Sequence, residues 1–312
     1  MKKIACMFPG QGSQKVGMGK QLYEAYEEVR ELYKRANEVL DKDITSLMFE
    51  GPQEQLTETE NAQPALLLSS VAAYTLFEKE KITPSMVVGH SLGEYSALVV
   101  AGAIPVDEAL PLVQTRGRLM EKAYPKGKGT MAAVLGMKEE EIQPIVEQID
   151  DEIVDVANLN CPGQIVISGS KAGVDRASEL LKEAGARRVL PLNVSGPFHS
   201  RLMKEANEDF AKYLDETTIS NATIPVYANV TAKPVKQKEE IKQLLLEQLY
   251  SPVRFEQSIR NMIDQGIEAF VEVGTGSVLS GLVRKIDRSV KTFSVQDEKT
   301  FEKFLTWYKE DA

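Results

Sequence analysis

Ser91 has the surroundings of a nucleophile, because it lies in the pattern Gly89-His90-Ser91-Leu92-Gly93 directly after the apolar residues 86–88. A strand that turns at once into a helix crowds its own backbone, and flanking glycines relieve that crowding. The serine is then strained, with its hydroxyl projecting outward. The backbone N–H of Leu92 would lie at the positive end of the helix, where an oxyanion can bind. The alternative is a plain strand-to-helix turn capped by a serine.

A serine nucleophile needs a base that titrates near neutrality, and histidine is the usual choice. The chain contains two histidines, His90 and His199. His90 is poorly placed, because adjacent residues on a tight turn generally point in different directions. His199 is therefore the base by elimination, if the protein uses serine chemistry, and it follows the serine in chain order as in α/β-hydrolases. No Asp or Glu pattern indicates what orients it, and a backbone carbonyl could do so.

Arg116 is the cation best placed to meet a substrate anion. Apolar residues three and four apart predict a helix over residues 107–123, and Arg116 borders its inward face whereas Arg118 faces away. An inward arginine needs an anionic partner, because an unpaired buried charge is costly. A structural salt bridge and a bound substrate anion both satisfy this requirement.

The glycine-rich loop at residues 9–14 follows an apolar strand at residues 4–8. Lys15 stands where a dinucleotide-binding loop would place its third glycine, and the loop lacks the Gly-Lys-Ser/Thr ending of a P-loop. We therefore expect a loop whose backbone approaches another group closely, with Gln11 as a hydrogen-bond donor.

Apolar strands alternate with helices along the chain. This pattern predicts an α/β protein with a parallel sheet, organised as an α/β-hydrolase-like body. Further strands are expected at residues 224–230 and 267–273, and further helices at 21–40, 61–77 and 241–250. After a flexible hinge at residues 126–129, the order βαββαβ predicts an inserted ferredoxin-like subdomain. The domains are then residues 1–127 and 192–312 for the body and 128–191 for the insertion. An amide-rich turn at residues 158–164 is expected inside the insertion.

Composition narrows the class of protein. The chain has 312 residues, a net charge of −9 and 43% hydrophobic residues, which argues against nucleic-acid and membrane-surface binding. We find no signal peptide or membrane-length apolar stretch. The two cysteines suggest neither a disulfide framework nor a metal site. A cytoplasmic protein without a bound metal is the expected result.

Six segments in order resemble one known family, the bacterial malonyl-CoA:acyl carrier protein transacylases of fatty-acid synthesis, which are related to the acyltransferase domains of polyketide synthases. The resemblance covers nearly the whole chain. Cys161 departs from the serine expected at its position, which affects only contacts at the rim of the cleft. The segments are Phe8-Pro9-Gly10-Gln11-Gly12-Ser13-Gln14, Gly89-His90-Ser91-Leu92-Gly93-Glu94, Gln114-Thr115-Arg116-Gly117, Asn160-Cys161-Pro162-Gly163-Gln164, Gly196-Pro197-Phe198-His199-Ser200 and Gln248-Leu249-Tyr250-Ser251-Pro252-Val253.

The resemblance implies an acyltransferase in which Ser91 is malonylated and His199 is its base. It implies an oxyanion hole formed by the backbone N–H groups of Gln11 and Leu92. Arg116 would bind the free carboxylate of the malonyl group.

The resemblance also implies that the backbone carbonyl of Gln248 orients His199. Phe198 resembles the malonyl-selecting form, because its ring leaves little room for a branching methyl group. Asn160 and His90 are further candidates for lining the cleft.

The implied substrates are malonyl-CoA and the phosphopantetheine of acyl carrier protein, with no permanently bound cofactor. Two other classes stay open. A serine esterase or lipase would use the same serine and histidine without requiring Arg116. A non-catalytic module that docks carrier proteins would not acquire an acyl group on Ser91.

Overall fold

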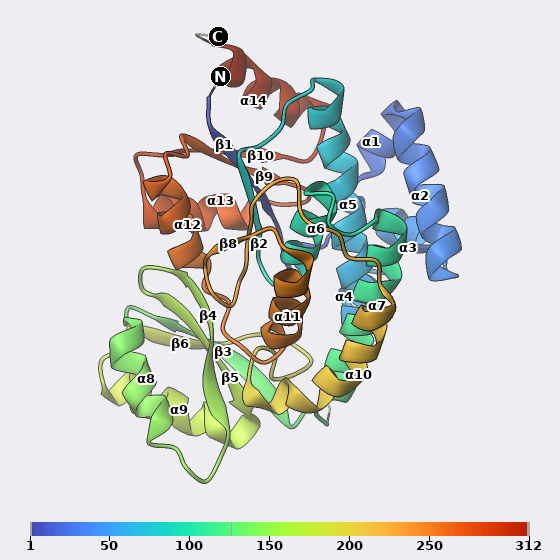
Figure 1. Ribbon diagram of the computed structural model, residues 1–312. Helices are drawn as coiled ribbons and strands as arrows, with labels where there is room; N and C mark the ends of the chain where they lie inside the picture. The colour runs from blue at the N-terminus through green and yellow to red at the C-terminus, as the bar shows by residue number, and fades with distance from the viewer. Residues whose placement is uncertain (1, 126, 311–312) are drawn as a thin grey trace.

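The computed structural model describes residues 2–125 and 127–310, and the mixed α/β fold expected from the sequence is confirmed. A six-stranded sheet forms the centre of the body (Figure 1). All neighbouring strands in it are parallel except the last pair. Its strands in spatial order are β10 (Lys291–Val295), β9 (Ala269–Val273), β1 (Ile4–Phe8), β2 (Met86–Gly89), β7 (Val226–Tyr227) and β8 (Pro234–Val235).

Helices cover both faces of this sheet, which explains why β1 is buried at every position. Alternate residues of a strand point to opposite faces. Ala5 and Met7 pack against α12 (Phe255–Asp264) and α13 (Val278–Ile286), whereas Cys6 packs on the other face. The helices on the Cys6 side include α5 (Thr59–Lys79), α6 (Leu92–Val100) and α7 (Val106–Lys122).

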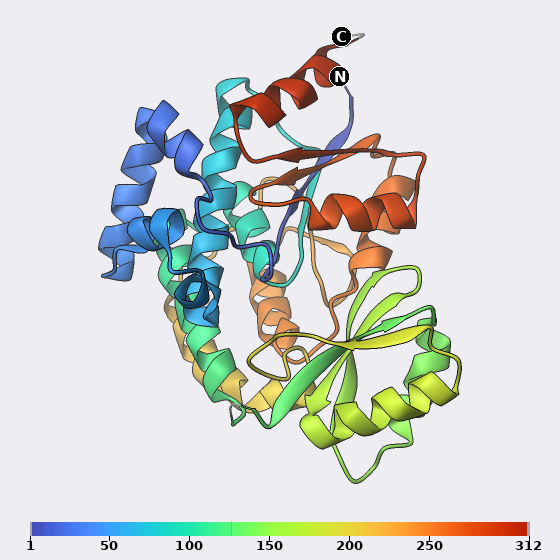
Figure 2. The ribbon, with the colours of Figure 1, turned by 180° about the vertical axis from the view of Figure 1, so that it is seen from behind.

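The remaining helices of the body surround this core, and both described ends of the chain lie on the same side of the molecule (Figure 2). The C-terminal helix, α14 (Glu298–Lys309), has a capping box in which Asp297 accepts a hydrogen bond from the backbone of Thr300. These helices are α1 (Lys20–Ala25), α2 (Glu27–Leu40), α3 (Ile44–Glu50), α4 (Gln53–Thr57), α10 (Lys204–Glu216), α11 (Lys238–Gln248) and α14 (Glu298–Lys309), with a 3₁₀ turn η1 (Arg201–Met203).

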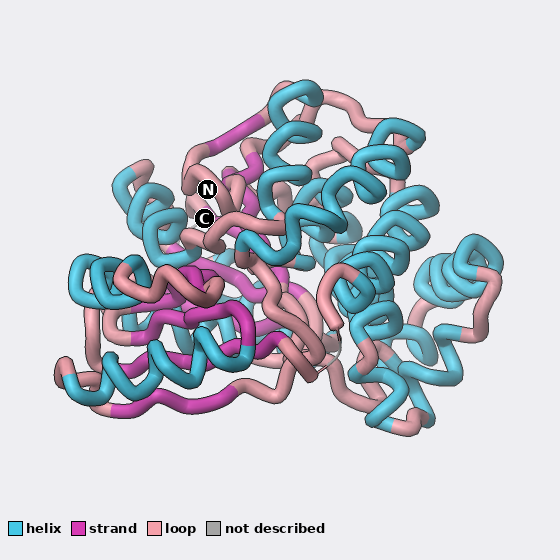
Figure 3. The backbone as a smooth tube through the Cα atoms, turned by 90° about the horizontal axis from the view of Figure 1, so that it is seen from below, coloured by secondary structure: helices cyan, strands magenta, loops and turns pink. Residues whose placement is uncertain are grey.

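A smaller antiparallel sheet of four strands, in the order β4-β5-β3-β6, lies below the body (Figure 1). Two helices cover one of its faces and share an apolar cluster with it, and Figure 3 shows the helices running alongside the strands. The predicted order βαββαβ is confirmed, whereas the domain boundaries at 128 and 191 stay a prediction. Its elements are β3 (Gly129–Leu135), α8 (Glu139–Glu147), β4 (Val154–Cys161), β5 (Gln164–Ser170), α9 (Lys171–Glu183) and β6 (Arg188–Pro191).

Three sequence expectations were wrong in detail. The helix predicted over residues 21–40 is broken at Tyr26, whose backbone is extended; its hydroxyl donates to Glu298, and Lys79 lies over its ring. The strand predicted over residues 224–230 is only Val226–Tyr227, because residues 229–232 form a turn. The amide-rich turn at 158–164 is mostly strand, and only Pro162 and Gly163 turn the chain. Residue 126 of the expected hinge lies outside the described residues.

Candidate active site

Ser91 lies on a strained turn between β2 and α6, with φ 50° and ψ −107°. The glycines predicted to allow this turn have no room for a side chain. A Cβ on Gly89 would lie 1.8 Å from the backbone carbon of Gly93, and a Cβ on Gly93 would lie 2.0 Å from the carbonyl oxygen of Phe8. The close approach of β1, β2 and α6 therefore forces the serine into its strained, half-buried position.

His199 lies against this serine, with 2.8 Å between its Nε2 and the Ser91 Oγ. Its Nδ1 is 2.8 Å from the backbone carbonyl oxygen of Gln248. A carbonyl only accepts hydrogen bonds, so Nδ1 carries the ring proton and Nε2 is free to accept the serine proton. The sequence predicted both contacts, the first by elimination and the second through the family resemblance.

His199 is held neutral by its surroundings. His199 is 4% exposed, and burial, followed by the charge of Arg116, lowers its pKa to about 3. The imidazole is therefore neutral at physiological pH and its Nε2 lone pair is available, although a pKa this far below neutrality also makes His199 a weak proton acceptor. A backbone carbonyl carries no full charge, so it stabilises the imidazolium less than the carboxylate of a typical triad would.

Arg116 extends from α7 to the same serine and is 1% exposed. Its Nη2 donates to the Ser91 Oγ at 3.1 Å and to the Gln248 Oε1 at 2.9 Å, and its Nη1 donates to the Gln63 Oε1 at 2.8 Å. All three partners are neutral. A buried cation beside a nucleophile, held by neutral groups, is suited to receive the carboxylate of a substrate. Arg118 is exposed on the outer face of α7, as predicted.

Gln248, at the end of α11, connects these groups. Besides its backbone contact with His199, its side-chain Nε2 donates to the Glu94 Oε2 at 2.8 Å and to the Ser91 carbonyl at 3.1 Å. Glu94 is 2% exposed, and burial raises the pKa of its carboxyl to about 7. The orientation of the Gln248 amide is thereby fixed, with its oxygen toward Arg116.

The Asn229 side chain is hydrogen-bonded to the backbone of the turn that contains Ser91. Its Oδ1 accepts from the Ser91 backbone N–H at 2.8 Å, and its Nδ2 donates to the Gly89 carbonyl at 2.6 Å. Its own backbone N–H donates to Glu94 at 3.0 Å. Sequence reasoning missed Gln63, Glu94 and Asn229. Glu94 stands beside the serine motif and offered a signal, whereas Asn229 follows a two-residue strand and offered none.

A cavity of about 170 Å³ opens in front of Ser91. The predicted residues Gln11, Leu92, Phe198 and His90 line it, together with Arg116 and His199. The remaining lining residues are Gly12, Gln14, Thr57, Ser91, Met120, Met131, Asn158, Leu192, Asn193 and Val194. The predicted oxyanion donors and the Phe198 ring thus lie at one cavity with Ser91.

The backbone N–H groups of Gln11 and Leu92 are free to bind an oxyanion, because neither donates to an acceptor in the part of the chain that the structure describes. Gln11 is anchored by its side chain, whose Nε2 donates to Thr59 at 3.2 Å. The prediction for Asn160 needs correction. Its amide oxygen is 2.8 Å from the Nε2 of His90, so it supports a cavity wall, and Asn158 takes the expected place at the cavity.

Metal chemistry was not expected, and within residues 2–125 and 127–310 no cluster of three potential protein ligands is present. No helix in these residues is both long and apolar enough to cross a bilayer. The two cysteines are buried as free thiols.

A serine nucleophile on a strand-to-helix turn, paired with a histidine at the edge of a parallel sheet, defines a class of enzymes that form acyl-serine intermediates. Comparison with known proteins narrows the class. The model of the acyl transferase domain matches residues 6–305, and the chain belongs to this family.

The chain is 51% identical to the malonyl CoA-acyl carrier protein transacylase of Bacillus subtilis, with 100% of this chain and 99% of the relative aligned. It is 47% identical to the transacylase of the same name from Staphylococcus aureus, with both chains fully covered.

Among solved structures, an acyl carrier protein S-malonyltransferase from Vibrio cholerae superposes with a TM-score of 0.95 at 43% identity, covering 97% of this chain and 100% of that one. A malonyl-transacylase in complex with its type II polyketide acyl carrier protein superposes with the same TM-score at 39% identity, covering 98% and 99%.

Proposed function

We propose that this protein transfers the malonyl group of malonyl-CoA to the phosphopantetheine thiol of acyl carrier protein, and so supplies extender units for fatty-acid synthesis. The observation that supports this most is Arg116, whose Nη2 lies 3.1 Å from the Ser91 Oγ. A malonyl group bound to that oxygen carries a free carboxylate, which the planar guanidinium can bind with two parallel hydrogen bonds. An acetyl or simple ester substrate has no group to pair with this buried charge.

The first half of the reaction loads the enzyme. The Ser91 Oγ attacks the thioester carbonyl of malonyl-CoA while the Nε2 of His199 takes the hydroxyl proton. The resulting oxyanion is held by the backbone N–H groups of Gln11 and Leu92. When the C–S bond breaks, the CoA sulfur leaves with the proton from His199, and malonyl-Ser91 remains.

The second half reverses these steps with a new thiol. The phosphopantetheine thiol gives its proton to His199 and attacks the malonyl ester, and the Ser91 oxygen then leaves and regains that proton. Hydrolysis is slow only if water is kept out, and the buried positions of Arg116 and His199 favour this. The proposal includes no permanently bound cofactor and no nucleic-acid or membrane partner, and a cytoplasmic location stays a prediction.

The mass of holo-carrier protein after incubation with malonyl-CoA and a catalytic amount of enzyme tests the proposal. We expect the carrier to gain one malonyl group with the wild type and none with Ser91→Ala. An esterase would instead release malonate from malonyl-CoA at the same rate with or without carrier. A docking module would produce neither change.

A further inference from the structure

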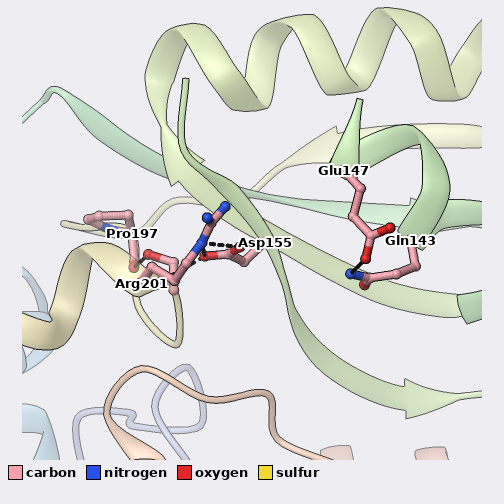
Figure 4. Close-up of polar contacts among 6 residues, drawn as sticks. Gln143, Glu147, Asp155, Pro197 and Arg201 are labelled. Atoms are coloured by element: carbon pink, nitrogen blue, oxygen red, sulfur yellow. Dashed lines mark hydrogen bonds and ion pairs between the residues drawn. The ribbon is translucent and has the colours of Figure 1, made fainter. Parts of the chain in front are cut away.

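The loop that carries His199 (residues 192–200) is tied to the smaller sheet by one side chain. Asp155 on β4 accepts a hydrogen bond from the backbone N–H of Arg201 at 2.8 Å. Its Oδ1 and Oδ2 also accept hydrogen bonds from the Arg201 Nε, at 2.9 and 3.2 Å. Figure 4 shows this contact, with the Asp155 carboxylate facing the Arg201 side chain. A carboxylate of the smaller sheet thus binds the chain two residues after the base.

The same strand is joined to two other parts of the active site. Two backbone hydrogen bonds of 2.8 and 2.9 Å connect β4 to Val253, five residues after Gln248. Asn160, near the end of β4, lies 2.8 Å from the ring of His90, which precedes Ser91. β4 therefore contacts the segment after Gln248, the turn of the nucleophile and, through Asp155, the loop of the base.

His199 needs such support, because its backbone is in the left-handed region, with φ 58°, and its loop contains neither helix nor strand. A non-glycine residue keeps such a conformation only where its surroundings impose it. The Asp155 side chain is 23% exposed and that of Arg201 is 55% exposed. An ion pair this exposed adds little to global stability.

We propose that Asp155 is a positioning residue, which fixes the His199 loop through Arg201 and so holds the imidazole within hydrogen-bonding distance of Ser91. The inference rests on the proposed function, because it concerns the base of the same reaction. The smaller sheet then contributes to the alignment of the catalytic pair as well as to the cavity wall.

Single-turnover loading of Ser91 from malonyl-CoA, followed by intact mass, tests this inference in the full-length protein. For Asp155→Ala we expect the loading rate at saturating malonyl-CoA to fall about tenfold, with KM changed less than about twofold, because misplacement of a catalytic group acts on the chemical step. Asp155→Asn keeps an acceptor for the Arg201 N–H, so it should recover part of the rate. If the alanine variant does not fold, the loading rate of Asp155→Asn relative to the wild type provides the test.

Asp151→Ala is the matched control, because Asp151 forms an exposed ion pair of 2.5 Å with Arg176 in the same part of the chain. A second readout is the pH dependence of loading. A loosened loop admits water to His199, whose pKa then rises toward its ordinary value. As the pH is lowered, the loading rate of Asp155→Ala should therefore begin to fall at a higher pH than that of the wild type. Equal rates and equal profiles for Asp155→Ala and Asp151→Ala would overturn the inference. Failure of the wild type to load would instead overturn the proposed function.

Discussion

Replacing Arg116 by alanine should change which acyl group the enzyme accepts far more than whether it reacts. Two charge-assisted hydrogen bonds to the malonyl carboxylate would be lost, each worth about 1.5–3 kcal/mol. At 1.36 kcal/mol for each factor of ten, the malonyl transfer rate should fall about 10² to 10⁴-fold.

Acetyl transfer lacks that carboxylate and should fall about tenfold at most, through loss of the hydrogen bond from Nη2 to the Ser91 Oγ. The diagnostic quantity is therefore the ratio of malonyl to acetyl kcat/KM, measured with both CoA thioesters on one preparation. Arg118→Ala is the control, because Arg118 is exposed on the opposite side of the same helix and should leave the ratio unchanged. An equal fall of both rates in Arg116→Ala would refute the carboxylate assignment.

Three further substitutions examine other parts of the site. The raised pKa of Glu94 means that the folded protein binds more protons than the unfolded chain between its usual value of 4.5 and about 7, so its contribution to stability is lost as the pH rises through that window. The stability advantage of Glu94→Gln over the wild type in urea denaturation should therefore increase as the pH rises from about 5 to about 8. A difference in unfolding free energy that does not depend on pH would contradict the burial of an ionisable Glu94. Phe198→Ala should raise methylmalonyl transfer relative to malonyl transfer by about tenfold, because space opens in the cavity, and competition between the two CoA thioesters would show it. Asn229→Ala should lower the free energy of unfolding by about 1–3 kcal/mol and reduce kcat, because the Ser91 N–H and the Gly89 carbonyl lose their partner; a stable variant of normal kcat would argue that the turn holds its shape unaided.

The sequence predicted the parts of the site that have local signals. Ser91 lies within its own motif, and the glycines around it have the steric role expected of them. Arg116 could be assigned to an inward position from helical periodicity alone. His199 was found because the chain offers two histidines and one lies beside the nucleophile. In each case a short stretch of chain determines the feature.

Features that depend on distant contacts could not be predicted. Asn229 acts on a turn about 140 residues earlier in the chain, and only the pairing of β7 with β2 brings the two together. Tyr26 interrupts an amphipathic segment, and its hydroxyl binds Glu298, a residue near the C-terminus that no local pattern could indicate. The contact between Asp155 and Arg201 likewise joins β4 of the smaller sheet to the 3₁₀ turn η1 of the body. All three features involve contacts between residues far apart in the chain, which local sequence patterns do not encode.

The central claim is that Ser91 carries a malonyl group during turnover, and intact-mass analysis of the enzyme after brief exposure to malonyl-CoA tests it most directly. The wild type should gain the mass of one malonyl group, mapped to the peptide that contains Ser91, and should lose it when holo-carrier protein is added. Ser91→Ala should gain nothing. A malonyl group found on another residue, or an unmodified wild type that still loads the carrier, would contradict the account.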